Sequence, residues 1–197
     1  MKTVTISILM AISTFASAQR LEQIASKLNR SMPTVELREL RNQAERLCVN
    51  SSPGWLNYYY VAYADIELSF RTTNEQEKRQ YLNDAQNYLS KITDGDKSEV
   101  STLQGYWYFA LMALDPRVNG PKYTSNIISC YEKALKINPE NPRAIVLYAI
   151  FKNRMEKSMG GAYKEFSSDI ECAQKLFNAQ DSLSGKPCWG SSLFKLQ

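Results

Sequence analysis

Apolar residues recur at helical spacing along most of this chain, and no segment shows the sustained alternation that is typical of a strand. In residues 81–92, six apolar positions fall on one helix face: Tyr81, Leu82, Ala85, Tyr88, Leu89 and Ile92. The pattern predicts about eight helices, over or within residues 21–28, 33–48, 55–70, 81–92, 99–114, 127–135, 142–151 and 162–177. The predicted fold class is therefore all-α.

The predicted helices alternate in how much of their surface is apolar. Residues 55–70, 99–114 and 142–151 are aromatic or apolar on several sides, whereas residues 81–92, 127–135 and 162–177 have one apolar face. Such alternation between sandwiched and outer helices is typical of antiparallel helical hairpins stacked in a row. We expect a loop within two of the pairs, around residues 116–123 and 155–161, because both segments contain glycine and the first also contains proline.

The junction at residues 131–144 resembles the tetratricopeptide repeat (TPR). Six positions match its pattern of large, small and closing residues: Tyr131, Ala134, Pro139, Ile145, Tyr148 and Ala149. The two candidates for the small first-helix position, Gly105 and Ala149, are 44 residues apart, whereas a TPR unit has about 34. The resemblance implies a short right-handed solenoid, similar to exported bacterial TPR-like proteins, that binds a protein or peptide in a concave groove.

The first 18 residues have the composition of a secretory signal peptide. Lys2 provides the positive start, residues 4–15 an apolar segment, and Ala16-Ser17-Ala18 a cleavage site. We expect an exported protein, periplasmic or secreted, that is cleaved after Ala18 and contains no membrane-spanning segment. Residues 19–183 are long enough for one helical domain, and residues 184–197 are predicted to be a tail that packs on the last repeat.

Composition excludes several kinds of chemistry. The chain has no histidine, which excludes Ser-His-Asp and Cys-His catalysis and histidine-ligated metal sites. Its 24 Lys and Arg are interspersed with 20 Asp and Glu, so the charge does not indicate a nucleic-acid partner. Asp65, which stands among aromatic residues, is the single acid with a candidate role in chemistry, and its ordinary role would be a hydrogen bond between helices. We therefore expect no enzyme, no metal and no cofactor.

Four cysteines allow three fully paired connectivities: Cys48, Cys130, Cys172 and Cys188. A bridge between Cys172 and Cys188 would tie the tail to the last helix. Buried free thiols are the alternative.

Residues 55–70 and 99–114 hold too many aromatic side chains for one buried stripe, because consecutive helical residues point about 100° apart. Some rings should reach a binding groove, and the candidates are Tyr59, Tyr63, Tyr106, Tyr108 and Tyr148. Packing between helices is the alternative role for these rings. The predicted function is a non-enzymatic scaffold for a protein or peptide, and the alternative is a small-ligand or glycan-binding module that uses the same aromatic residues.

Overall fold

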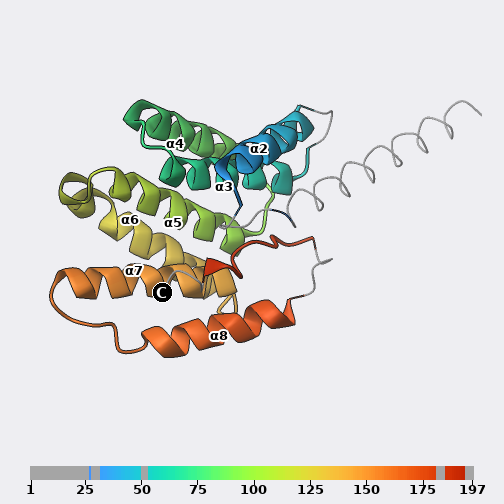
Figure 1. The fold of residues 1–197 in the computed structure, drawn as a ribbon. Coiled ribbons are helices and arrows are strands. Elements are labelled where there is room, and N and C mark those ends of the chain that lie inside the picture. Colours follow the sequence, from blue (N-terminus) through green and yellow to red (C-terminus); the bar gives the residue numbers. More distant parts are fainter. Residues whose placement is uncertain (1–26, 28–31, 50–52, 181–184, 194–197) are drawn as a thin grey trace, which may run out of the picture.

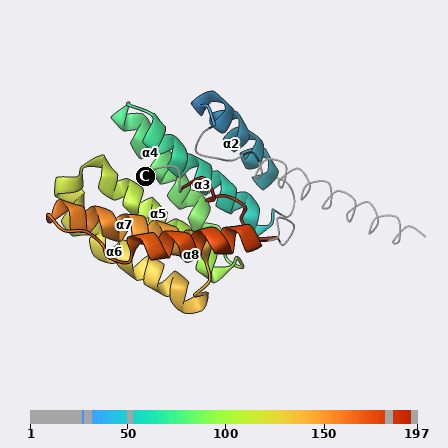
Figure 2. The same ribbon diagram turned by 60° about the horizontal axis from the view of Figure 1, so that its bottom comes forward.

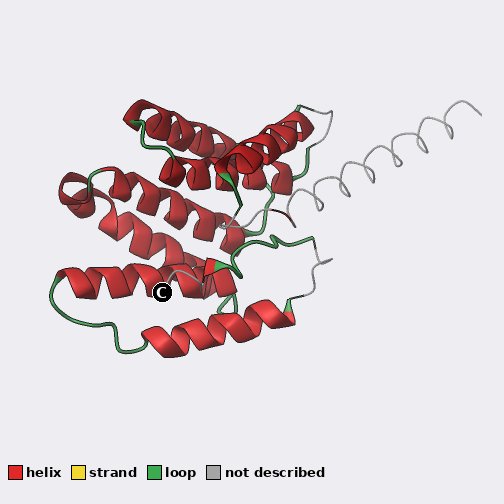
Figure 3. Ribbon diagram, in the orientation of Figure 1, coloured by secondary structure: helices red, strands yellow, loops and turns green. Residues whose placement is uncertain are grey.

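The computed structural model describes residues 27, 32–49, 53–180 and 185–193. Within these residues it contains seven helices and no strand (Figure 3): α2 (Thr34–Cys48), α3 (Trp55–Arg71), α4 (Glu75–Ser90), α5 (Lys97–Leu114), α6 (Pro116–Ile137), α7 (Pro142–Ser158) and α8 (Phe166–Ala179). The all-α prediction is confirmed for the described chain. The predicted signal peptide lies outside the described residues, and so does all of the predicted helix 21–28 except Lys27. None of the described helices is both long and apolar enough to cross a membrane.

Neighbouring helices pack in pairs (Figure 1). α3 packs on α4, α5 on α6 and α7 on α8, and α2 lies against α3. α5 also contacts both α3 and α7, so α3, α5 and α7 form an inner row. Figure 2 shows the same arrangement from a second direction, with α3 beside α4 and α7 beside α8. Most of α3 and about half of α5 and α7 are buried, whereas α4, α6 and α8 each bury one short stripe. The alternation predicted from the apolar pattern is therefore confirmed.

Asparagine and aspartate side chains begin four of the helices. Asn74, Asp96, Asp115 and Asn141 are the N-cap residues of α4, α5, α6 and α7, and each accepts hydrogen bonds from two backbone N–H groups of its helix. These bonds satisfy N–H groups that have no partner within the helix. Proline follows the cap in α6 and α7, where a missing N–H costs nothing.

The loop predicted around residues 116–123 is wrong, because this segment is the start of α6. Only Asp115 separates Leu114, the last residue of α5, from Pro116, the first residue of α6. Asp115 caps α6 where α5 ends, and Asn119 Nδ2 donates to the carbonyl of Leu111 in α5 at 2.9 Å. Pro121 lies inside the helix but near its start, so the helix loses one hydrogen bond and continues. The second predicted loop is present, and it begins after α7 ends at Ser158.

α5 and α6 pack tightly against each other at Gly105. A Cβ atom added to Gly105 would lie 2.8 Å from Cε1 of Tyr131. Such a distance is too short for two carbon atoms, so the Tyr131 ring occupies the space that a larger residue would need. The small residue expected at this position therefore has a packing role.

Candidate functional site

The tail lies across the inner row of helices, and its contacts reach far beyond the last pair (Figure 1). Residues 185–193 are described, and Pro187, Trp189 and Leu193 are buried. Trp189 has an exposed fraction of 1%. Because its contacts include α3 and α5, the tail has a larger role than the predicted one of packing on the last repeat.

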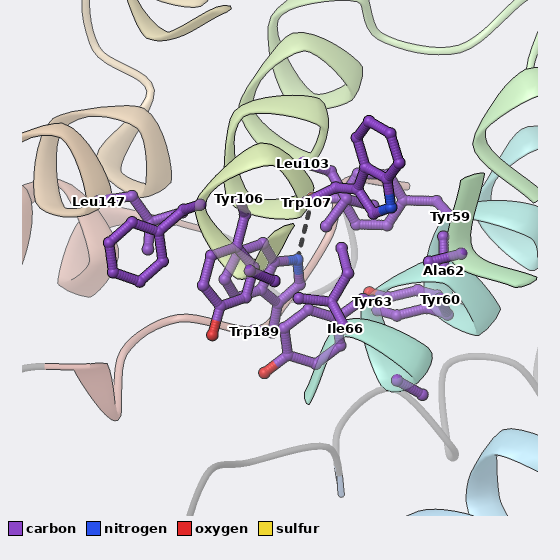
Figure 4. Packing of buried hydrophobic residues seen from close by; sticks show 14 of the residues in the cluster. Tyr59, Tyr60, Ala62, Tyr63, Ile66, Leu103, Tyr106, Trp107, Leu147 and Trp189 are labelled. Carbon is purple, nitrogen blue, oxygen red and sulfur yellow. Dashed lines mark hydrogen bonds between the residues drawn. The ribbon is translucent and has the colours of Figure 1, made fainter. Parts of the chain in front are cut away.

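The Trp189 side chain lies between tyrosine rings of two inner helices (Figure 4). Its ring centroid is 4.3 Å from that of Tyr63 in α3, at an interplanar angle of 27°. On the other helix, the Tyr106 centroid is 6.0 Å away at an angle of 20°. We call the flat space between Tyr63 and Tyr106 that Trp189 fills the indole slot. Near-parallel aromatic rings at these separations stabilise one another beyond their buried area.

A chain of buried hydrogen bonds connects the indole to all three inner helices. Trp189 Nε1 donates to Tyr59 Oη at 2.9 Å, and Tyr59 donates to Glu99 Oε2 at 3.2 Å. The other carboxylate oxygen of Glu99 accepts from Arg143 Nη1 at 3.2 Å. Burial raises the pKa of Glu99, and the positive charge of Arg143 opposes that rise. The network therefore ties the position of the tail to a buried ion pair between α5 and α7.

Arg143 is fully buried, and several of its partners belong to the tail or lie beside it. Its Nη2 donates to Gln180 Oε1 at 3.1 Å and to the carbonyl oxygen of Pro187. Its guanidinium carbon lies 5.7 Å from the Trp189 ring centroid and 5.3 Å from that of Phe177. The Nε atom has no hydrogen-bond partner in the part of the chain that the structure describes. A buried, incompletely bonded cation thus adjoins the indole slot.

Two further residues bring the tail close to the helices. The Cys188 backbone N–H donates to Tyr60 Oη at 3.0 Å, and the Cys188 Sγ atom is 3.3 Å from the same oxygen. Gly190 has a φ of 108°, and a Cβ there would lie 2.8 Å from the Phe177 ring. Glycine is therefore favoured at this position both by the left-handed backbone and by the close contact.

The predicted binding tyrosines separate into two groups. Tyr59, Tyr63 and Tyr106 are buried and meet around Trp189. Tyr108 and Tyr148 are half-buried and lie elsewhere: the Tyr108 ring is 5.9 Å from that of Tyr123, and the Tyr148 ring is 5.6 Å from that of Tyr131. The structure brings three of the five together, but as the lining of a filled slot and not as an open groove. Their role in binding stays a prediction.

Arg143 and Glu99 were not identified from the sequence as members of this site. Arg143 stands in the predicted repeat junction, where its neighbours indicate only a helix start. A single arginine beside a helix cap carries no local signal of burial, because its partners are 37 to 44 residues away in sequence.

The proposed bridge between Cys172 and Cys188 is absent. All four cysteines lie in the described ranges, and each is a free thiol. Cys172 and Cys188 are both exposed; Cys172 lies on α8, and the Cys188 thiol contacts Tyr60 of α3. No group of three or more His, Cys, Asp and Glu side chains among the described residues is placed to hold a metal ion.

Asp65 has the structural role that its sequence context indicated. Its two carboxylate oxygens accept from Arg41 Nε at 2.8 Å and from Arg41 Nη2 at 3.3 Å. Arg41 also pairs with Glu45 of its own helix and approaches Asp84 of α4. The acid therefore links α2, α3 and α4, and it lies apart from the residues around Trp189.

Fold and site together define an all-helical protein whose own tail fills a slot between the inner helices. No protein-family model matches the chain, and no curated protein matches it significantly. The chain is similar in structure to the HusA haemophore from Porphyromonas gingivalis, with a TM-score of 0.77 and 26% sequence identity. The alignment covers 89% of this chain and 88% of the haemophore. The similarity therefore extends over nearly the whole of both proteins.

Proposed function

We propose that this chain is an exported, non-enzymatic protein that binds a flat, largely apolar small molecule, with haem or a related porphyrin as the ligand. The observation that carries the proposal is the similarity to a haemophore over 89% of the chain. The stacked rings of Tyr63, Trp189 and Tyr106 support it, because aromatic side chains in this arrangement suit a planar ligand. This is the small-ligand alternative of the sequence analysis, and it replaces the protein scaffold as the preferred function.

The composition limits how a haem could be held. Because the chain has no histidine, imidazole cannot ligate the iron. Tyrosine, methionine and cysteine are the remaining side chains that commonly ligate haem iron in proteins. We therefore expect most of the affinity to come from burial of the porphyrin face and from pairing of its carboxylates, with a weaker contribution from the metal.

The proposal also includes a TPR-like arrangement of the helices and export from the cytoplasm. The pairing of α3 with α4, α5 with α6 and α7 with α8 is compatible with a short right-handed TPR-like solenoid. The signal-like segment ending at Ala18 supports export to the periplasm or the exterior. A protein that captures a ligand outside the cytoplasm would need both a stable helical frame and an export signal.

The test is an absorbance titration of purified residues 19–197 with hemin. We expect the Soret band to shift and to saturate at one hemin per chain, because a built site has a fixed capacity. Metal-free protoporphyrin IX should bind with an affinity within about tenfold of that of hemin, if the ring and its carboxylates supply most of the free energy.

Hemin also adsorbs to many apolar surfaces, so stoichiometry and competition provide the control. Hemin bound at the saturable site should be displaced by gallium protoporphyrin IX but not by a monosaccharide. Failure of hemin to saturate at a defined stoichiometry would contradict the proposed function, and saturable sugar binding would favour the glycan alternative instead.

A further inference from the structure

We propose that the indole slot is the ligand site itself and that the tail occupies it as an intramolecular substitute for a planar aromatic carboxylate. The inference rests on the proposed function, because it names the place and chemical class of that ligand. It adds a competitor within the chain: Trp189 takes the position of the ligand's ring, and the Pro187 carbonyl takes the position of its carboxylate.

The shape of the indole slot suits a planar ligand. Trp189 lies within 27° of parallel to Tyr63 and within 20° of parallel to Tyr106. The aromatic lining continues beyond the indole, because the Phe70 ring lies 5.7 Å from Tyr106 and 6.3 Å from Phe109. The space that a departing tail leaves would therefore be flat and lined by rings from α3 and α5, which fits a large planar ligand.

The Nε–Nη2 edge of Arg143 suits a carboxylate. An arginine binds a carboxylate side-on through Nε and Nη2, which point the same way. Glu99 uses Nη1 and leaves this edge to other groups. On that edge, Nη2 donates to the Pro187 carbonyl, and Nε has no hydrogen-bond partner among the described residues. The tail thus supplies one neutral acceptor, the Pro187 carbonyl, to a pair of N–H groups that could bind both oxygens of a carboxylate.

The incomplete pairing is informative because Arg143 is fully buried. An unsatisfied buried N–H destabilises a folded protein, so such groups are uncommon. A ligand carboxylate at the position of Pro187 would satisfy both N–H groups of the edge. The guanidinium carbon of Arg143 also lies 5.7 Å from the centroid of the Trp189 ring. A ligand ring in the place of the indole would therefore lie beside the same arginine.

The inner helices bind one another without the tail. Tyr106 donates to Glu67 at 2.6 Å between α5 and α3, and Arg143 pairs with Glu99 between α7 and α5. The tail is joined to this frame by the bonds of Pro187, Cys188 and Trp189 to Arg143, Tyr60 and Tyr59. Displacement of the tail therefore leaves the walls of the slot in place.

The test follows the indole N–H signals by NMR while the mature chain, residues 19–197, is titrated with gallium protoporphyrin IX, which is diamagnetic. Trp189 Nε1 donates to Tyr59, and Trp107 Nε1 donates to the Leu82 carbonyl at 2.7 Å in another part of the core. Both protons should exchange slowly with solvent in the free protein. Bound porphyrin should make the Trp189 proton exchange at least about tenfold faster, while the Trp107 proton stays protected as an internal control.

The outcomes separate the two proposals. Saturable porphyrin binding with an unchanged Trp189 signal would overturn the slot as the site while leaving the proposed function intact. An absence of porphyrin binding by both the wild-type protein and Trp189→Ala would overturn both.

Two tryptophan variants test whether Trp189 competes with the porphyrin. Trp189→Ala should lower the apparent dissociation constant by about tenfold, because the porphyrin no longer competes with the indole. Trp107→Ala is the matched control, since it also empties a buried indole position, and equal gains in both variants would mean general loosening and would overturn the competition.

The ligand itself tests the role of Arg143 without a change to the protein. The dimethyl ester of gallium protoporphyrin IX should bind the wild-type chain about tenfold more weakly than the free acid, because it lacks the carboxylates that Arg143 would pair with. Equal affinity for acid and ester would contradict the assignment of Arg143.

Discussion

The buried carboxyl of Asp65 makes the stability of the protein depend on pH. Burial raises the pKa of this carboxyl to about 7, and the two hydrogen bonds from Arg41 act against the rise. Glu45 and Asp84 add negative charge around the same arginine, and Tyr88 donates to Glu45 at 2.6 Å. The folded protein therefore binds a proton at Asp65 more tightly than the unfolded chain does.

The sign of the pH dependence follows from this difference. Between about pH 4 and pH 7, the unfolded chain has lost the Asp65 proton while the folded protein keeps it, so stability falls as the pH rises. We predict that the wild-type free energy of unfolding, relative to Asp65→Asn, decreases by roughly 1 kcal/mol for each pH unit in this window. Urea unfolding at pH 4, 5.5 and 7 measures it, and a difference that does not change with pH would contradict the raised pKa.

Arg143 and Glu99 form a more deeply buried ion pair, and its loss should be severe. Arg143→Met would remove the positive charge that pairs with Glu99, and the buried carboxylate would keep its hydrogen bond from the Tyr59 hydroxyl. Removal of one partner from a buried pair destabilises a protein by about 3 to 5 kcal/mol. Urea unfolding of Arg143→Met should show such a loss. The same measurement on Arg38→Met, whose partner Glu77 is exposed, should show a change of less than about 1 kcal/mol.

Gly105 lies where α5 packs against α6, and glycine substitutions can test this contact. Gly105→Ala would place a Cβ 2.8 Å from Tyr131, which should destabilise the protein by about 1 to 3 kcal/mol. Gly120→Ala lies in α6 directly before Pro121, and apart from its chain neighbours and its own helix backbone the new Cβ would meet no atom within 4 Å. Helix propensity favours this alanine and the following proline disfavours it, so the net change should be below about 1 kcal/mol. Thermal unfolding should therefore show the larger loss for Gly105→Ala, and equal losses in the two variants would contradict the packing described here.

Helix positions were predictable because they depend on local spacing. Each described helix overlaps a segment that the apolar period identified, and the inner row was visible in the excess of aromatic residues. The start of α6 was not predictable in the same way, because Asp115 and Pro116 are both a stop signal for one helix and a start signal for the next. Only the packing of α5 against α6 decides between a loop and a direct connection.

The candidate site was predictable only in part. Tyr59, Tyr63 and Tyr106 stood out as surplus rings on the inner helices, but nothing in their spacing identifies the side chain that covers them. The hydrogen bond from Trp189 to Tyr59 joins residues 130 positions apart. Local patterns carry no information about contacts at this separation, and for the same reason the buried position of Arg143 was missed.

At the scale of the whole molecule, the tail contributes core residues to a domain that is otherwise a row of paired helices. Truncation after Gly185 would remove Trp189 and Leu193, both buried, and would expose Tyr63 and Tyr106. Loss of a buried tryptophan costs about 3 to 5 kcal/mol, which lowers the melting temperature of a domain of this size by about 10 °C.

The truncated protein should also respond more strongly to ligand. Because a ligand that binds only the folded state raises its melting temperature, saturating gallium protoporphyrin IX should recover part of the loss. Differential scanning calorimetry with and without the porphyrin measures both effects. An unchanged melting temperature after truncation would mean that the tail contributes nothing to stability.

The long sequence separation between Trp189 and Tyr59 also has a kinetic consequence. Contacts within the helix pairs are local and close small loops, whereas the tail contact spans 130 residues, so its closure carries a larger entropy cost. During refolding from denaturant, the helix pairs should therefore assemble before the indole docks. For that interval the protein is a folded frame with an open slot, and a flat apolar compound present in the buffer could enter before the tail does. Preparations refolded with and without porphyrin should then differ in how much ligand they retain, even when their final conditions are identical.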